Sequence, residues 1–333
     1  MVNKSIKIPE IDRMPLPDVM PTEEAIRSFG QNEHSYHPDM WELEYAMHQY
    51  LNGMTDETLV GRYSDLVRSM FSFVSPERGV VPIPSYQSSW YWYRKEHQTR
   101  LEFAFRNLTP PSLSICPAKE QFWPPSKTVP NGIDVIFRYG KRQYMREMVN
   151  DGHIRFSPAE TYAETGNNSA RQDDELRKHA FRSGKYTKVT TESGQTLPVI
   201  GDITYTTTGA NYHLVCFSCV WDEQLFSEFE ADTCVAVTQP EMLACRIEAA
   251  GKSVFLGWYF HHNPVQYFDP YELRKNEYFG AGMSKDFRFA YQNEYRILWS
   301  QMDQLPISGS RFVDIGDARD IMVMYDIDGR EVS

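Results

Sequence analysis

The sequence lacks the features of an exported or membrane-spanning protein. Its N-terminus, MVNKSIKIPEIDRMPLPDVMP, has no apolar stretch of signal-peptide length and no cleavage-like site. No apolar run approaches the roughly 18 residues that a membrane helix needs. Cysteine is scarce, with five residues in a chain of 333 and no secreted spacing. We therefore expect a cytoplasmic protein with reduced thiols and no membrane contact.

Basic residues are fewer than acidic ones. The chain has 45 Asp and Glu against 34 Lys and Arg, a formal net charge of −11. As a whole it lacks the basic footprint of a protein that holds duplex nucleic acid, although a small basic cleft inside an acidic shell is compatible with this balance. The hydrophobic content of 41% is enough for a large core.

Several common catalytic and metal-binding motifs are absent. The chain has no Walker loop, no GxGxxG, no GxSxG and no HExxH. Cys216 and Cys219 have the spacing of half a zinc site, but no second pair follows, so we interpret them as core residues on opposite faces of a strand. His261 and His262 likewise project in opposite directions. We expect no metal.

Residues 1–130 are expected to form an N-terminal arm and a helical region. Proline and charge in residues 1–37 favour an extended arm. Apolar spacing from Pro38 predicts two helices broken near Gly53, and Trp90 to Phe105 predicts a third with an aromatic face. We expect these aromatics to be core, the alternatives being a partner site or a nucleic-acid stacking surface. The proline-rich segment 110–130 predicts a linker.

Residues 131–333 are expected to form an α+β domain in which strands dominate. The pattern predicts a strand over 132–140, a helix over 141–152 capped by Gly152, and a strand and turn over 153–162. The remaining predicted elements are a helix at 240–250 and strands at 202–207, 212–219, 233–237, 254–260, 294–299 and 311–315.

Three segments contain residues that could take part in catalysis or ligand binding. Strand periodicity places Gln292, Glu294 and Arg296 on one face, although a cross-strand ion pair on a solvated sheet face fits equally. Arg138 precedes Gly140 and a helix, which suits an anion, but it also fits an ordinary edge strand. In the third segment, Asn168 or Ser169 is expected to cap a short helix whose first turn holds the acids Asp173 and Asp174.

This order of elements resembles the ADP-ribosyltransferase superfamily. An arginine strand, a helix ending in glycine, a serine-bearing strand and a late Gln-x-Glu strand follow one another over about residues 133–300. The chain also resembles a bacterial family of unassigned function that ends in an aromatic-rich Glu-Tyr-Arg strand, a divergent branch of the same fold. The resemblance implies a mixed, mostly antiparallel sheet domain of ADP-ribosyltransferase type after the helical region.

The resemblance also implies an activity and a site. The enzyme would use NAD as substrate, without a metal, and transfer ADP-ribose to a protein or nucleic-acid (RNA or DNA) acceptor. Glu294 would be catalytic and Gln292 would help select the acceptor. The residues implied to bind NAD are Arg138, Tyr139, Ser157, Tyr162 and Arg171. The sequence departs from the family where Pro-Ala follows Ser157 in place of a Ser-Thr-Ser run, and it has no evident His-Tyr-Glu set.

A biological role and two alternative functions accompany this hypothesis. Toxin-like relatives imply a toxin of a toxin–antitoxin or phage-defence system, with an antitoxin protein as partner. The alternatives are a non-catalytic interaction module and an NAD glycohydrolase. The enzyme hypothesis requires Arg138, Ser157 and Glu294 to meet in one cleft, whereas scatter over about 15 Å or more would exceed a ligand pocket and contradict it.

Overall fold

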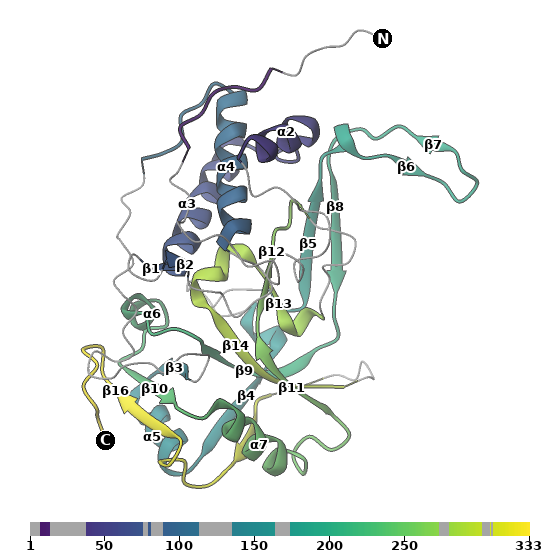
Figure 1. Ribbon diagram of the computed structural model, residues 1–333. Coiled ribbons are helices and arrows are strands. Elements are labelled where there is room, and N and C mark those ends of the chain that lie inside the picture. Colours follow the sequence, from purple (N-terminus) through teal and green to yellow (C-terminus); the bar gives the residue numbers. More distant parts are fainter. Residues whose placement is uncertain are drawn as a thin grey trace.

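The chain combines α-helices with a mostly antiparallel sheet, as expected of an α+β fold (Figure 1). The computed structural model describes residues 7–13, 38–75, 79–80, 89–112, 135–163, 174–272, 280–301, 307 and 309–333. Within these ranges, none of the helices has both the length and the apolar composition that a membrane crossing requires.

The N-terminal region is helical, as its apolar spacing predicts. Its elements are α2 (Pro38–His48), α3 (Asp56–Phe73), α4 (Ser89–Phe105) and the short hairpin of β1 (Val74–Ser75) and β2 (Gly79–Val80). A turn over 49–54 contains the predicted break at Gly53. Of the arm, residues 7–13 are described; Ile8 and Ile11 pack against the helices, and Arg13 pairs with Glu42.

Helix α4 buries aromatic and charged side chains together. Trp92 and Tyr93 are buried, in agreement with the predicted aromatic face, while the side chains of Trp90 and Tyr91 lie outside the described part. The following turns bury seven polar or charged residues, namely Arg94, Lys95, Glu96, His97, Gln98, Thr99 and Glu102. A helix with this composition needs ionic partners from elsewhere in the chain.

An eight-stranded antiparallel sheet forms the C-terminal body. Its strands are β3 (Ile136–Gly140), β4 (His153–Pro158), β9 (Tyr212–Ser218), β10 (Thr233–Val237), β11 (Tyr259–Pro264), β14 (Glu294–Ser300), β15 (Arg311–Asp314) and β16 (Met322–Tyr325). The main path runs β11-β14-β9-β3-β10-β16, and β4 joins β15 to β9. Its largest core cluster includes Val235, Ile297 and Trp299.

Helices and short elements connect the strands. These are α5 (Arg142–Asn150), α6 (Glu223–Glu228), α7 (Pro240–Gly251), the 3₁₀ helices η1 (Ala159–Tyr162), η3 (Ala281–Met283) and η4 (Phe287–Gln292), and the parallel pair β12 (Gln266–Phe268) and β13 (Ser284–Asp286). Gly152 follows α5 with φ of 65°, the left-handed conformation predicted for a glycine cap. A Cβ there would lie 2.1 Å from the Gly316 carbonyl oxygen.

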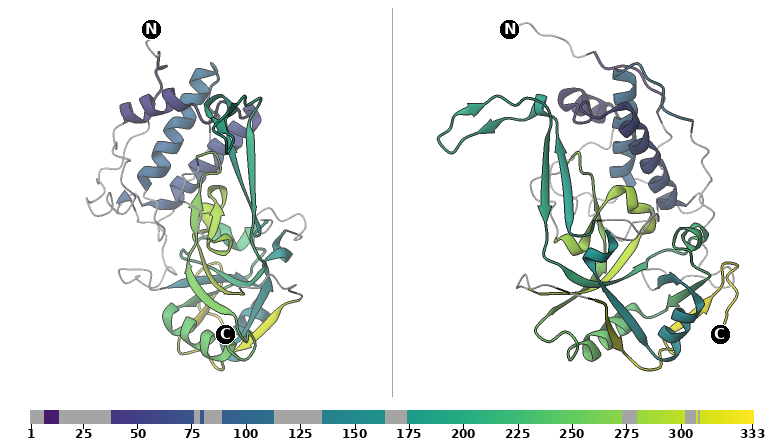
Figure 2. Two further views of the ribbon diagram at one scale, coloured as in Figure 1. Left: turned by 90° about the vertical axis from the view of Figure 1, so that its right-hand side faces the viewer. Right: turned by 180° about the vertical axis from the view of Figure 1, so that it is seen from behind.

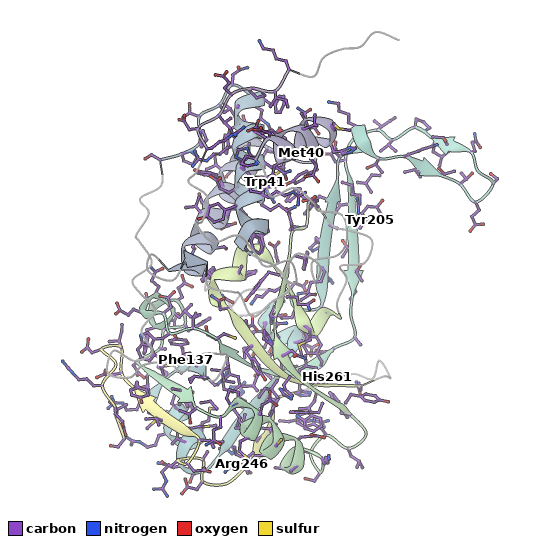
Figure 3. The ribbon with its side chains drawn as sticks, viewed as in Figure 1. Met40, Trp41, Phe137, Tyr205, Arg246 and His261 are labelled. Carbon is purple, nitrogen blue, oxygen red and sulfur yellow. The ribbon has the colours of Figure 1, made fainter. Side chains whose placement is uncertain are left out.

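A two-stranded ribbon extends away from this body (Figures 1 and 2). It consists of β5 (Arg177–Arg182), η2 (Gly184–Tyr186), β6 (Val189–Thr190), β7 (Thr196–Leu197) and β8 (Ile203–Thr208). Tyr205 lies on β8, well separated from Phe137 in the sheet (Figure 3). We refer to residues 177–208 as the ribbon arm.

Two sequence predictions are wrong. The strand expected at 254–260 is a turn followed by β11, because Phe255 turns inward and stacks on Trp299 with ring centroids 4.9 Å apart. Asp174 does not lie in a helix: its carboxylate accepts the N–H groups of Leu176 and Arg177 where β5 begins. The predicted capping residues Asn168 and Ser169, and the acid Asp173, lie outside the described residues.

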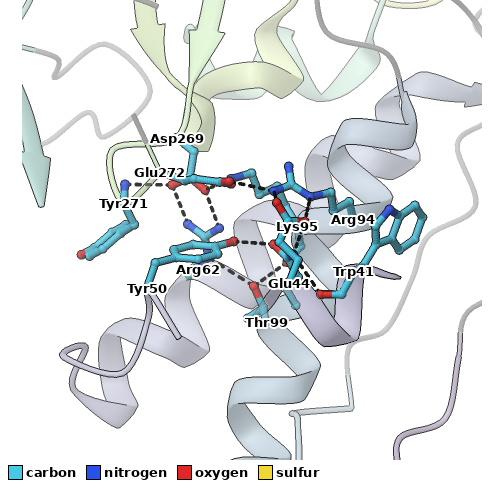
Figure 4. A network of polar contacts seen from close by, with 11 residues as sticks. Trp41, Glu44, Tyr50, Arg62, Arg94, Lys95, Thr99, Asp269, Tyr271 and Glu272 are labelled. Atoms are coloured by element: carbon cyan, nitrogen blue, oxygen red, sulfur yellow. Dashed lines mark hydrogen bonds and ion pairs between the residues drawn. The ribbon is translucent and has the colours of Figure 1, made fainter. Parts of the chain in front are cut away.

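A buried ionic network joins the N-terminal helices to the sheet body (Figure 4). The Arg62 guanidinium donates two hydrogen bonds to the Asp269 carboxylate, at 2.9 and 2.7 Å, and Lys95 Nζ lies 3.0 Å from the same group. Burial alone would raise the pKa of Asp269, but these cations outweigh it and hold the pKa below its usual range. Beside the network, Trp41 and Trp92 share an apolar cluster with body residues.

Candidate functional site

The sheet divides at β9. Ser218 at one end of this strand pairs with Phe137 of β3, whereas Leu214 and His213 nearer the other end pair with Ser157 and Pro158 of β4. The two neighbouring strands therefore diverge, and a cavity of about 700 Å³ opens at the division. This volume lies within the usual range for small-molecule sites.

Aromatic and charged side chains dominate the wall of this cavity. The charged ones include both signs, so the cavity could contact both anionic and cationic groups of a ligand. The aromatic lining residues are Phe137, Tyr139, Tyr144, Tyr162, Phe217, Phe229 and Phe312; the charged ones are Arg138, Lys141, Glu147, Arg155, Glu175, Glu230, Lys285 and Glu294.

The candidate residues named from sequence lie together here. Arg138, Tyr139, Ser157, Tyr162, Gln292 and Glu294 all line the cavity, although they come from β3, β4, η1, η4 and β14. Arg171 lies outside the described residues. Arg138, Ser157 and Glu294, the three residues that the enzyme hypothesis requires in one cleft, therefore all lie on the wall of this cavity.

Glu294 is held as a buried carboxylate at the start of β14. Arg296 Nε donates to Oε1 at 2.6 Å and Lys285 Nζ to Oε2 at 2.9 Å. Burial alone would raise its pKa, but Arg296 and Lys285 outweigh burial and lower the pKa of Glu294 below its usual range. Because Glu294 and Arg296 are 5% and 0% exposed, the alternative of a solvated sheet face is wrong.

Sequence reasoning missed two members of this cluster, Glu175 and Lys285. Arg296 Nη2 donates to Glu175 Oε1 at 2.7 Å, so one guanidinium joins both carboxylates. Lys285 Nζ also donates to Gln292 Oε1 at 3.1 Å. Gln292 ends η4 rather than lying on the strand, and the left-handed Asn293, with φ of 44°, turns the chain into β14. No strand-period signal could have revealed these contacts.

Arg138 spans the division of the sheet. Its Nη1 donates to the Cys216 carbonyl at 2.5 Å, and its guanidinium lies 5.7 Å from the Phe217 ring centroid. Strand β3 runs between β9 and β10, so the edge-strand interpretation of Arg138 is wrong. Burial raises the pKa of the neighbouring Cys216 thiol, which therefore stays protonated and is a poor nucleophile.

The two tyrosines have different surroundings. The Tyr139 hydroxyl accepts the Asp222 N–H and donates to the Val220 carbonyl, both at 2.9 Å, and its ring packs against Trp221, Phe226 and Phe229, so this side chain serves the fold. Tyr162 packs beside Cys216, and burial raises its pKa. Of the two rings, that of Tyr162 is the one suited to a flat, partly cationic group in the cavity.

Removing Lys285 tests its hold on Glu294. The lowered pKa means that Glu294 stabilises the fold above its ordinary pKa of about 4.3, and this stabilisation is lost as the pH falls through the lower folded-state pKa. In Lys285→Met the folded pKa returns toward the ordinary value. The variant should therefore lose less unfolding free energy than the wild type between about pH 6 and pH 3, measured by urea denaturation.

A matched control is Lys252→Met, which removes an exposed lysine paired with Glu248. It should keep the wild-type pH dependence. Identical pH dependence of Lys285→Met and the wild type would show that Lys285 does not hold the carboxylate ionised.

Neither a cluster of metal ligands nor a relative of known function guides the interpretation of the described residues. No cluster of three or more His, Cys, Asp or Glu in the described ranges has a metal-binding arrangement. No protein family, no curated protein and no solved structure matches the chain. A function must therefore be argued from the cavity itself.

Proposed function

We propose that the protein is an NAD-dependent ADP-ribosyltransferase that transfers ADP-ribose to a macromolecular acceptor. The observation that carries the proposal is the buried, ionised Glu294 in a cavity that Arg138, Ser157, Tyr162 and Gln292 also line. The role implied by the toxin-like resemblance, a bacterial toxin with an antitoxin partner, belongs to the same proposal.

The proposed reaction needs a fixed anion. The bond between nicotinamide nitrogen and ribose C1′ breaks, and nicotinamide leaves with the electron pair. Positive charge develops on the ribose as in glycoside cleavage, and the Glu294 carboxylate stabilises it. The acceptor nucleophile then bonds to C1′ and releases its proton to solvent.

The ion pairs of Glu294 define its role. A carboxylate whose pKa is held low by Arg296 and Lys285 is a weak base, so its contribution is electrostatic rather than proton abstraction. In this proposal Gln292, which accepts a hydrogen bond from Lys285, orients the acceptor. The Arg138 guanidinium presents parallel N–H donors whose spacing matches the phosphate oxygens of NAD.

Incubation of the purified protein with NAD labelled in its ADP-ribose part, together with cell protein and RNA, tests the proposal. We expect release of nicotinamide and label on a macromolecule. Free ADP-ribose without labelled macromolecule would identify an NAD glycohydrolase instead. Folded protein that releases no nicotinamide would favour a non-catalytic interaction module.

The same assay measures the role of Arg138. Loss of charged hydrogen bonds to phosphate in Arg138→Gln should raise the KM for NAD by about 10- to 100-fold. The control Arg246→Gln removes a half-buried arginine that lies outside the cavity lining and pairs with Asp320, and it should keep the wild-type KM. An unchanged KM in Arg138→Gln would remove this residue from the NAD site.

A further inference from the structure

The ribbon arm differs in charge from the rest of the chain. Residues 177–208 contain five Lys and Arg against two Asp and Glu, a net charge of +3 within a chain of −11. The remainder therefore carries −14. A basic segment in an acidic chain concentrates positive potential locally.

The basic side chains of the arm are accessible. Arg182, Lys185 and Lys188 are exposed and follow one another along the outgoing strand and its continuation. Lys178 is the exception, because it is buried 3.8 Å from Glu175. The views from opposite sides show β6 and β7 projecting beyond the rest of the molecule (Figures 1 and 2), whereas β5 packs against Tyr271 through Phe181.

The base of the arm is part of the cavity wall. Glu175, which lines the cavity and pairs with Arg296, lies two residues before β5. The Gly209 N–H donates to the Leu176 carbonyl at 2.8 Å and closes the base of the ribbon. A polymer bound along the arm therefore leads toward Glu294.

We propose that the ribbon arm binds the phosphate backbone of a nucleic acid. A two-stranded ribbon has the dimensions of a nucleic-acid groove, and the arm carries ten Ser and Thr, whose hydroxyls join Lys and Arg as common donors to phosphate. Ile200, 96% exposed, adds an apolar side chain of the kind that wedges between bases. That the bound nucleic acid is also the acceptor rests on the proposed transferase function.

The arm predicts a definite salt dependence. Three phosphates neutralised by Arg182, Lys185 and Lys188 release about three counterions, which gives a slope of log K against log salt of about −2 to −3. Binding of fluorescently labelled duplex DNA or single-stranded RNA should therefore weaken about 20- to 40-fold between 50 and 200 mM salt.

Fluorescence anisotropy without NAD tests the proposal on three proteins. The first is the wild type, the second replaces Arg182, Lys185 and Lys188 with glutamine, and the third carries the same charge change elsewhere. The third replaces Lys252, Arg319 and Arg330, all exposed on the sheet body. The arm variant should lose at least tenfold in affinity and most of its salt slope, whereas the body variant should bind like the wild type.

Several outcomes would overturn the inference. Equal losses in the arm and body variants would mean that net charge, not the arm, governs binding. Polyglutamate bound as tightly as nucleic acid would point to an acidic protein partner. A dimer that the arm variant abolishes in sedimentation, without nucleic-acid binding, would make a second copy the occupant. Glu294→Gln should retain binding, so failure of the transferase proposal remains distinguishable from failure of this one.

Discussion

Glu294→Gln should reduce nicotinamide release from NAD by about 10² to 10³-fold. The substitution keeps the size of the side chain and removes the charge that would stabilise the developing ribose cation, and losing one preorganised stabilising group costs about this much. The loss should appear in kcat rather than in KM, because the group acts chiefly in the transition state. Steady-state kinetics of nicotinamide release measure both constants.

The matched control is Glu248→Gln on α7, which makes the same chemical change at an exposed position. It should leave kcat unchanged. Glu294→Gln should keep the far-UV circular dichroism spectrum and the NAD affinity of the wild type. These two measurements separate a loss of catalysis from a loss of folding. A Glu294→Gln enzyme within about threefold of the wild type would be incompatible with the electrostatic role proposed for this carboxylate.

Asp269→Asn should destabilise the protein by about 3 to 5 kcal/mol. The substitution leaves Arg62 and Lys95 buried without the carboxylate that they share, and breaking one partner from a buried ion pair has this cost. Urea denaturation at neutral pH measures the change in unfolding free energy. The stabilisation by Asp269 should hold above its ordinary pKa of about 3.9 and disappear at lower pH as the group protonates.

Asp320→Asn provides the comparison, because Asp320 also receives two hydrogen bonds from one arginine, Arg246, but is 58% exposed. Water replaces the lost partner there, so the unfolding free energy should stay within the error of the measurement. Equal effects of the two substitutions would show that the Asp269 network contributes nothing beyond a surface pair.

Local patterns predict most of the secondary structure. The helices α2, α3, α5 and α7 and the strands β9, β10 and β14 occur where apolar periodicity places them. The strand β5 was not predicted, because Arg177, Lys178 and Arg182 give it no apolar alternation. It gains stability from pairing with β8, a contact between distant segments that a local pattern does not contain.

The candidate site is only partly visible in the sequence. Arg138 stands out because it is the charged residue of an otherwise apolar strand, and Glu294 stands out because it and Arg296 interrupt an apolar strand. Glu175 and Lys285 lie in irregular or very short segments. They line a cavity that exists because β3 and β4 diverge from β9, and this is a property of the sheet that a local pattern does not contain. The sequence pattern of α4 also does not reveal which of its side chains are buried. Lys95 and Glu96 have the polarity of a solvated helix surface, but both lie inside the protein.

The Arg62–Asp269 pair also sets a condition on synthesis. The two residues are 207 positions apart, so the ribosome makes the helices long before their buried counter-charge. At about 5 to 20 residues per second, the interval is about 10 to 40 s. During it Arg62 and Lys95 must remain hydrated, and the nascent helices cannot close into their final packing. The emergence of Asp269 from the ribosome is therefore the earliest point at which the helical region and the cavity-bearing sheet can become one cooperative unit.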